Sequence, residues 1–158
     1  IKEAEIGDPV SWSRFSNIFP SLNYKTKISY EDYDSKGNPT QLVDEYGVRT
    51  SYVWGYDGLY PVVKAVNVTR DVLNTKLGIT AHEPLQDGLS DPNESDDFPL
   101  FDIDGALINL YYYEPHVGMT KYCDSTRRWT YFSYDAFGRL IMKWDDVGAV
   151  ETYEYHIE

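Results

Sequence analysis

The sequence predicts a mainly β fold, an antiparallel meander of β-hairpins with roughly nine or ten strands and one or two short helices inserted midway. Six residues recur at a constant offset of 101: Tyr33, Asp34, Gly37, Asp44, Gly47 and Tyr52 reappear as Tyr134, Asp135, Gly138, Asp145, Gly148 and Tyr153. Aromatic residues two positions apart and Asp-x-x-Gly tetrapeptides supply the rest of the pattern. A short pattern that repeats in this way is typical of repeated structural units.

The strands are indicated by pairs of aromatic residues at positions i and i+2. Two-residue spacing places both rings on one face of a strand, whereas a helix would splay them about 200° apart. Tyrosine, with 15 copies against 6 Phe and 4 Trp, is the residue that these pairs mainly use. The pairs are Tyr52 and Trp54, Tyr111 and Tyr113, Phe132 and Tyr134, and Tyr153 and Tyr155.

The turns are indicated by four Asp-x-x-Gly tetrapeptides, in which Asp accepts a local backbone hydrogen bond and Gly adopts positive φ. They begin and end at Asp34 and Gly37, Asp44 and Gly47, Asp135 and Gly138, and Asp145 and Gly148. Two positions depart from this pattern. Arg127 stands where a further turn should have Gly, and the turn from Glu114 to Gly118 is one residue longer. The pattern predicts that Gly138→Val destabilises the fold much more than Gly58→Val, because Gly138 closes a turn of this kind.

The chain is predicted to form a single domain with four parts. Residues 1–27 are an N-terminal covering segment, 28–67 a first repeat block, 68–109 an insert of helix and acidic loop, and 110–158 a second repeat block. The N-terminal part is not repeat-like, and its large apolar residues are expected to pack over a sheet face or edge. These residues are Trp12, Phe15, Ile18 and Phe19.

The insert is predicted to begin with a helix that is capped by Asn67 and ends at Gly78. Its apolar positions are Val68, Val72, Leu73 and Leu77. Residues 79–99 contain three prolines and an acidic run from Asp91 to Asp97, so they are expected to form an exposed loop. A second short helix is expected from Asp97 or Asp102 to about Asn109.

Composition excludes several classes of partner. The net charge of −12 argues against a nucleic acid and against an anionic membrane surface, because phosphate binding depends on clustered Lys and Arg. The longest apolar run, Ala106 to Tyr113, is far below the roughly 18 residues that span a bilayer. The single cysteine, Cys123, has no partner for an internal disulfide and is expected to fill a strand position.

The segments Tyr33-Asp34-Ser35-Lys36-Gly37-Asn38 and Phe132-Ser133-Tyr134-Asp135-x-x-Gly138-Arg139-Leu140 resemble YD repeats, the building unit of bacterial RHS-type proteins. The second copy is the closer match, since Asn38 replaces the usual Arg in the first. The resemblance implies hairpins laid side by side in a long sheet that presents a surface for contact, in a protein of the cell envelope or secreted. The family's self-cleaving core has paired Asp-Pro-x-Gly motifs, and only Asp91-Pro92 is present, so self-processing is not expected.

The sequence offers no catalytic residue, no cofactor site and no metal site. The histidines, His82, His116 and His156, have no metal-ligand spacing. Asp102 and Asp104 are similar to the start of a calcium loop, but Tyr113 stands where a bidentate Glu is required, so a helix-start cap is the favoured role. Enzymatic activity is therefore not expected.

Two functions remain open. The first is a non-enzymatic structural or interaction module whose partners are other repeats of the same protein or a second copy, joined through sheet edges. The alternative is a carbohydrate-binding module in which exposed rings contact a polysaccharide. The aromatic residues recur in every unit, which favours the structural function. The candidate contact surface comprises Trp54, Trp129, Tyr134, Arg139 and Tyr155.

Overall fold

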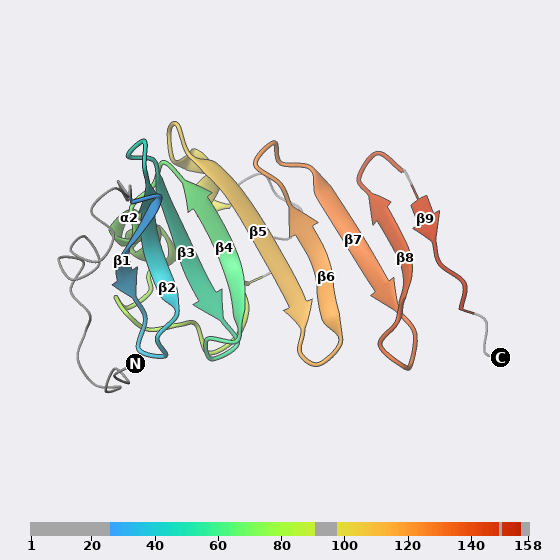
Figure 1. The fold of residues 1–158 in the computed structure, drawn as a ribbon. Coiled ribbons are helices and arrows are strands. Elements are labelled where there is room, and N and C mark those ends of the chain that lie inside the picture. The colour runs from blue at the N-terminus through green and yellow to red at the C-terminus, as the bar shows by residue number, and fades with distance from the viewer. Residues whose placement is uncertain (1–25, 91–97, 149, 156–158) are drawn as a thin grey trace, which may run out of the picture.

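The computed structural model describes residues 26–90, 98–148 and 150–155, which form one nine-stranded antiparallel sheet (Figure 1). The order of strands in the sheet follows their order in the chain. The strands are β1 (Ile28–Tyr33), β2 (Pro39–Asp44), β3 (Arg49–Gly55), β4 (Tyr60–Val66), β5 (Leu107–Glu114), β6 (Gly118–Cys123), β7 (Trp129–Tyr134), β8 (Leu140–Asp145) and β9 (Val150–Thr152). The predicted meander is confirmed, and β5 begins within the predicted insert.

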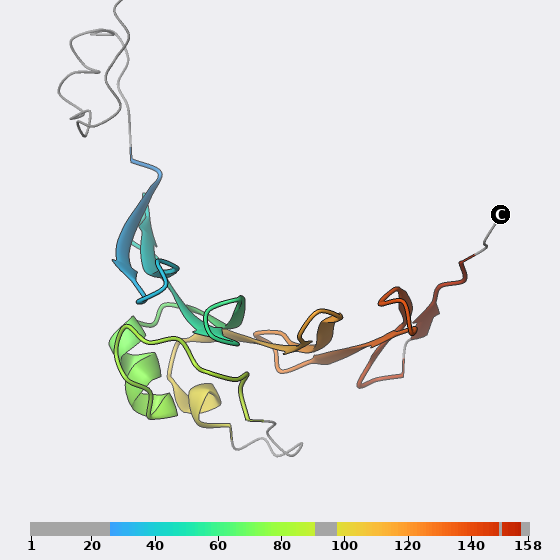
Figure 2. The same ribbon diagram turned by 90° about the horizontal axis from the view of Figure 1, so that it is seen from below.

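The insert between β4 and β5 folds back over one face of the sheet. Figure 2 shows the helix α2 (Arg70–Leu77) and the 3-10 helix η1 (Pro99–Asp102) on the same side of the sheet, near β3 to β5. Beyond the buried Cys123 at the end of β6, no described segment lies over that face at β6 to β9. The sheet is curved, and both β1 and β9 bend away from the side that carries the insert.

The start of α2 differs from the prediction. Thr69, with extended backbone, is the N-cap, whereas Asn67 has a φ of 63° and hydrogen-bonds through its backbone N–H to the carbonyl of Arg49. Asn tolerates positive φ better than most residues, so it serves as a turn residue here. The predicted end is confirmed, because Gly78 has a φ of 63° and caps the helix in the left-handed conformation.

The second predicted helix is much shorter than expected. The 3-10 helix ends at Asp102, and strand β5 begins at Leu107, where the helix was predicted to continue. The run Leu107–Glu114 alternates between buried and less buried side chains, so it matches a half-buried strand. Asp102 therefore closes a short helix, and its predicted role as a helix-start cap is wrong.

The described part of the predicted loop, residues 79–90, is tied to the end of β3. The N–H of Leu85 donates to the carbonyl of Trp54 at 2.8 Å, and the N–H of Tyr56 donates to the carbonyl of Asp87 at 3.1 Å. Gly55 makes this approach possible, because a Cβ there would lie 2.8 Å from the Asp87 oxygen. The acidic run 91–97 and residues 1–25, with the four large apolar residues predicted to cover the sheet, lie outside the described residues.

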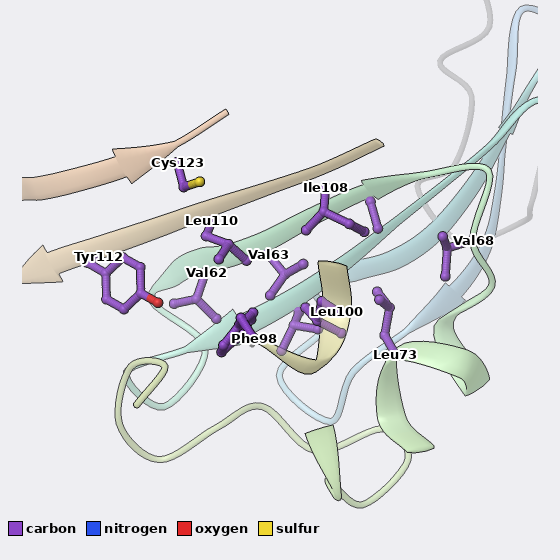
Figure 3. Packing of buried hydrophobic residues seen from close by; sticks show 12 residues of the cluster. Val62, Val63, Val68, Leu73, Phe98, Leu100, Ile108, Leu110, Tyr112 and Cys123 are labelled. Carbon is purple, nitrogen blue, oxygen red and sulfur yellow. The ribbon is translucent and has the colours of Figure 1, made fainter. Parts of the chain in front are cut away.

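The hydrophobic core lies between the insert and β3 to β6 (Figure 3). Leu73 of α2 and Leu100 of η1 are fully buried against strand residues such as Leu110. Each such side chain contributes about 1.5–3 kcal/mol on burial. The cluster consists of Val53, Val62, Val63, Ala65, Val68, Leu73, Phe98, Leu100, Ile108, Leu110, Tyr112 and Cys123.

Two consecutive valines of β4 reach this core because the β3–β4 register shifts. Val53 pairs with Val63 and Trp54 pairs with Pro61, so Val62 is left as the extra residue of a bulge. Both Val62 and Val63 are fully buried. A strict two-residue alternation would have placed one of them on the opposite face.

The turn glycines have the positive φ values that the sequence predicts, but so does Gly58, at 87° against 73° for Gly138. A Cβ at Gly58 would also lie 3.0 Å from Asn38 Nδ2 and 3.0 Å from Lys36 Cγ, whereas a Cβ at Gly138 meets nothing within 4 Å. The predicted ranking of the two valine substitutions therefore lacks its structural basis, because both sites strain a β-branched residue and only Gly58 is crowded.

We predict that Gly58→Val lowers the free energy of unfolding at least as much as Gly138→Val, each by about 1–3 kcal/mol, because both impose positive φ on valine. Urea unfolding monitored by tryptophan fluorescence measures both changes. A Gly58→Val variant with the wild-type midpoint, beside a destabilised Gly138→Val variant, would contradict this expectation.

Candidate functional site

Five turns share one pattern in which an aspartate carboxylate holds its own turn. Oδ1 of Asp135 accepts the N–H of Phe137 at 2.8 Å and that of Arg139 at 3.0 Å. The Arg139 N–H, followed by the Arg139 side chain and the Phe137 N–H, keeps the pKa of Asp135 below its usual value. The equivalent carboxylates accept the N–H two residues on; they are Asp34, Asp44, Asp124 and Asp145. These aspartates therefore hold the hairpins together.

The turns at Asp124 and Glu114, which depart from the Asp-x-x-Gly pattern, have the same length as the other turns. Arg127 adopts a φ of 66° in the turn that begins at Asp124. In the turn that begins at Glu114, His116 has a φ of 67° and Gly118 has a φ of 156°. Because Tyr113 pairs with Met119 just as Tyr134 pairs with Leu140, the turn at Glu114 is not longer than the one at Asp135.

The backbone ladders that join one hairpin to the next are short. Only three residue pairs join β6 to β7, from the pair Cys123–Trp129 to the pair Lys121–Tyr131. The β2–β3 and β8–β9 ladders are equally brief and end at Gln41 with Ser51 and at Met142 with Thr152. Within each hairpin the pairing continues to the turn. Carbonyl groups near the start of β2, β6 and β8 therefore need another hydrogen-bond donor.

An aromatic side chain supplies that donor at each of these three junctions. Tyr134 Oη donates to the carbonyl of Met119 at 2.8 Å, and Tyr155 Oη donates to the carbonyl of Leu140 at 2.8 Å. Trp54 Nε1 donates to the carbonyl of Pro39 at 2.9 Å. Every one of these bonds spans 15 residues, so they are equivalent contacts of the repeat. We call them the aromatic clasps.

The surroundings of each ring fit this role. Gly118 leaves room for the Tyr134 ring, because a Cβ there would lie 2.7 Å from the Tyr134 hydroxyl. At the next clasp the guanidinium of Arg139 lies 4.7 Å from the centre of the Tyr155 ring. Arg139 is also paired with Asp135, at 2.7 Å from Nη2 to Oδ2, so it links a turn to a clasp.

The five residues of the predicted contact surface are not brought together. Trp54 lies in β3, whereas Tyr155 follows β9 in the other half of the sheet. The polar groups of Trp54, Tyr134, Tyr155 and Arg139 are engaged in the clasps and turns described above. Trp129 differs, because its ring belongs to a separate row of stacked side chains.

This row, the aromatic ladder, consists of Trp129, Tyr131 and Trp144. The ring centres of Trp129 and Tyr131 are 6.4 Å apart, and those of Tyr131 and Trp144 are 5.4 Å apart, with interplanar angles of 25° and 14°. Trp129 continues toward the core through Tyr112, at 5.9 Å. The cross-strand pairs Leu110–Cys123 and Cys123–Trp129 show that the ladder faces the same side as the core.

The ladder lies where that face is no longer covered by the insert, so its three rings are half-exposed. Lys121 adds a positive charge, with its Nζ 4.5 Å from the Tyr112 ring centre and 5.1 Å from that of Trp129. Tyr131 and Trp144 were not among the residues predicted from the sequence to form a contact surface. The two-residue spacing of Trp129 and Tyr131 could have revealed the first, and pairing across the turn at Asp135 the second.

The cysteine and the histidines of the described residues lie on separate elements. Within residues 26–90, 98–148 and 150–155, no group of three or more His, Cys, Asp or Glu side chains could hold a metal ion. Burial raises the pKa of the Cys123 thiol to about 12, which makes it a poor nucleophile. His82 lies beside Asp32, with 3.3 Å between Nδ1 and Oδ1, at an exposed turn. In the described chain, no helix has the length and apolar character to span a bilayer.

We predict that Tyr134→Phe lowers the free energy of unfolding by about 0.5–1.5 kcal/mol, because it removes the hydroxyl of a clasp and leaves a carbonyl unpaired. Tyr46→Phe is the matched control, since the Tyr46 side chain is 81% exposed. Urea unfolding of the two variants measures the difference. Equal stability of the two variants would show that the clasp contributes nothing.

We also predict a loss of stability between about pH 10 and pH 12. Burial, followed by the neighbouring Tyr122 and Tyr113, raises the pKa of Tyr111 to about 12. Burial also raises the pKa values of Tyr52, Tyr113 and Tyr122. A raised folded-state pKa stabilises the fold below the unfolded value near 10 and stops doing so as pH rises through the folded value.

Urea unfolding at a series of pH values, with phenolate absorbance recorded on the folded protein, measures this loss. We expect a fraction of the tyrosines to ionise only above about pH 11 in the folded chain. Stability that stays constant to pH 12, or ionisation of every tyrosine near pH 10, would be inconsistent with these pKa shifts.

Comparisons with known proteins identify no family for this chain. No protein-family model matches this sequence, and no curated protein matches it. The likeness to YD repeats thus rests on the motif residues.

Proposed function

We propose that the chain is a non-enzymatic structural and interaction module of an exported bacterial protein of the YD-repeat or RHS type. In this role it presents a rigid sheet and pairs through a sheet edge with another repeat or with a second copy of itself. The repeated residues support a structural role. The polar groups of the turn aspartates and of the clasps form hydrogen bonds within and between the hairpins, so they are already engaged within the sheet. The proposal requires no bound cofactor and no catalytic residue.

The observation that carries the proposal is the open edge at β9. All three residues of β9 are exposed, and among the described residues β9 pairs only with β8. The N–H of Tyr153 donates inward to the carbonyl of Ile141, so the N–H of the preceding Thr152 points to the open side. An exposed strand edge of this kind is a template for another strand.

The alternative function, carbohydrate binding, is favoured by the aromatic ladder. Trp129, Tyr131 and Trp144 form a half-exposed row on the part of the core face that lies beyond the insert. Sugar rings commonly lie flat against aromatic faces. Here the rings are stacked side by side, so their faces are directed toward one another rather than toward a ligand. The edge-pairing function is therefore the better supported of the two.

We predict that the protein associates as its concentration rises and that Thr152→Pro abolishes this association, because proline removes the outward N–H donor. Thr152→Val is the matched control, since it alters the same side chain but keeps the N–H. Sedimentation velocity over a wide concentration range measures the association. A wild-type protein that stays monomeric throughout, or a Thr152→Pro variant that associates like the control, would refute the edge-pairing function.

An affinity gel containing bacterial surface polysaccharides tests the alternative in the same preparation. Retardation that is saturable and lost in Trp129→Ala and Trp144→Ala, with the fold intact, would favour carbohydrate binding. Trp54→Ala separates the two effects, because Trp54 belongs to a clasp rather than to the ladder. No retardation of the wild type leaves edge pairing as the function.

A further inference from the structure

A cleft of about 670 Å³ opens between the β5–β6 turn and the β7–β8 turn. It is distinct from the β9 edge and from the aromatic ladder, because its walls come from the ends of the hairpins. Its volume lies within the usual range for sites that hold a small group. The lining includes Glu114, His116, Thr120, Phe132, Tyr134 and Phe137.

The charge of this cleft comes from Glu114. Asp135 also lines the cleft, but its carboxylate is neutralised by Arg139, with 2.8 Å from Nε to Oδ2. In the described chain, Glu114 makes no ion pair. An exposed carboxylate beside aromatic rings is the combination that attracts a cation, through a charge-assisted hydrogen bond and through the ring faces.

The rings are arranged to receive such a group. Phe132 and Tyr134 form one side of the cleft, and the Tyr134 ring is held in place by its clasp to Met119. Phe137 is 79% exposed and already has the guanidinium of Arg139 at 5.3 Å from its ring centre. Phe132 and Tyr134 are therefore the rings that remain for a cation from outside.

Another pair of neighbouring turns in this sheet is joined by an ion pair. Lys36 of the β1–β2 turn reaches Asp57 of the β3–β4 turn, with 3.0 Å from Nζ to Oδ2. Among the described residues, no ion pair joins the β5–β6 turn to the β7–β8 turn, so the carboxylate of Glu114 lies at the cleft without a cationic partner.

We propose that this cleft binds a cationic side chain, lysine or arginine, of a basic partner protein. The net charge of −12 favours the approach of such a partner over the whole surface. Glu114 pairs with the cationic head group, while the aliphatic stem lies against Phe132 and Tyr134. The inference goes beyond the proposed function, because neither edge pairing nor the ladder requires this cleft.

Nuclear magnetic resonance titration with N-acetyl-arginine amide and N-acetyl-lysine amide tests the proposal. We expect saturable shifts confined to the amides of residues 114–120 and 132–138. The neutral analogue N-acetyl-citrulline amide should produce no saturable shift. Glu114→Gln should weaken binding by about tenfold or more, because it removes a charge-assisted hydrogen bond.

Glu154→Gln is the matched control, because it removes an exposed carboxylate elsewhere, and it should leave the affinity unchanged. The spectrum of each variant reports directly whether the fold is kept. Absence of shifts with both cationic probes, equal shifts with the citrulline probe, or unchanged binding by Glu114→Gln would each overturn the proposal. Such a failure would not affect the association measured by sedimentation. The cleft proposal and the edge-pairing function are therefore tested independently.

Discussion

The hydrogen bonds from aromatic side chains to carbonyl groups 15 residues earlier are the contacts on which this sheet depends. Backbone pairing between successive hairpins ends early, and the clasps of Trp54, Tyr134 and Tyr155 satisfy the carbonyls beyond it. The clasps explain why an aromatic residue with a polar edge recurs at these positions. A phenylalanine would fill the same space but could not donate the bond.

The two halves of the molecule are stabilised in different ways. Over β3 to β5 the insert supplies a second layer, and Leu73 and Leu100 close a core against the sheet. Beyond the buried Cys123 at the end of β6, no described segment supplies such a layer over β6 to β9, so this half relies on its ladders, turns, clasps and stacked rings. The surfaces that we propose to meet a partner lie in this half: its exposed rings, its open edge at β9 and the cleft at Glu114.

The local features of the fold could be predicted from the sequence, and the features that join distant segments could not. Asp135 and Gly138 specify a turn within five residues, so the Asp-x-x-Gly turns were predicted correctly. The aromatic pairs that begin at Tyr52, Tyr111 and Phe132 do lie in strands, whereas Tyr153 and Tyr155 follow the end of β9. The N-cap at Thr69 and the shortness of η1 depend on packing against the sheet, which overrides local preference. The clasp of Tyr134 was missed as a contact, because its acceptor is a backbone carbonyl that leaves no mark in the sequence.

Hydrogen–deuterium exchange compared between the wild type and Tyr134→Phe tests most directly the claim that clasps hold the hairpins together. Loss of this clasp should speed exchange of the amides in β6 to β9, because these strands have no covering layer to keep them closed. Exchange in β3 and β4, which lie against the core, should not change. Equal acceleration across the whole sheet, or no acceleration at all, would contradict the claim.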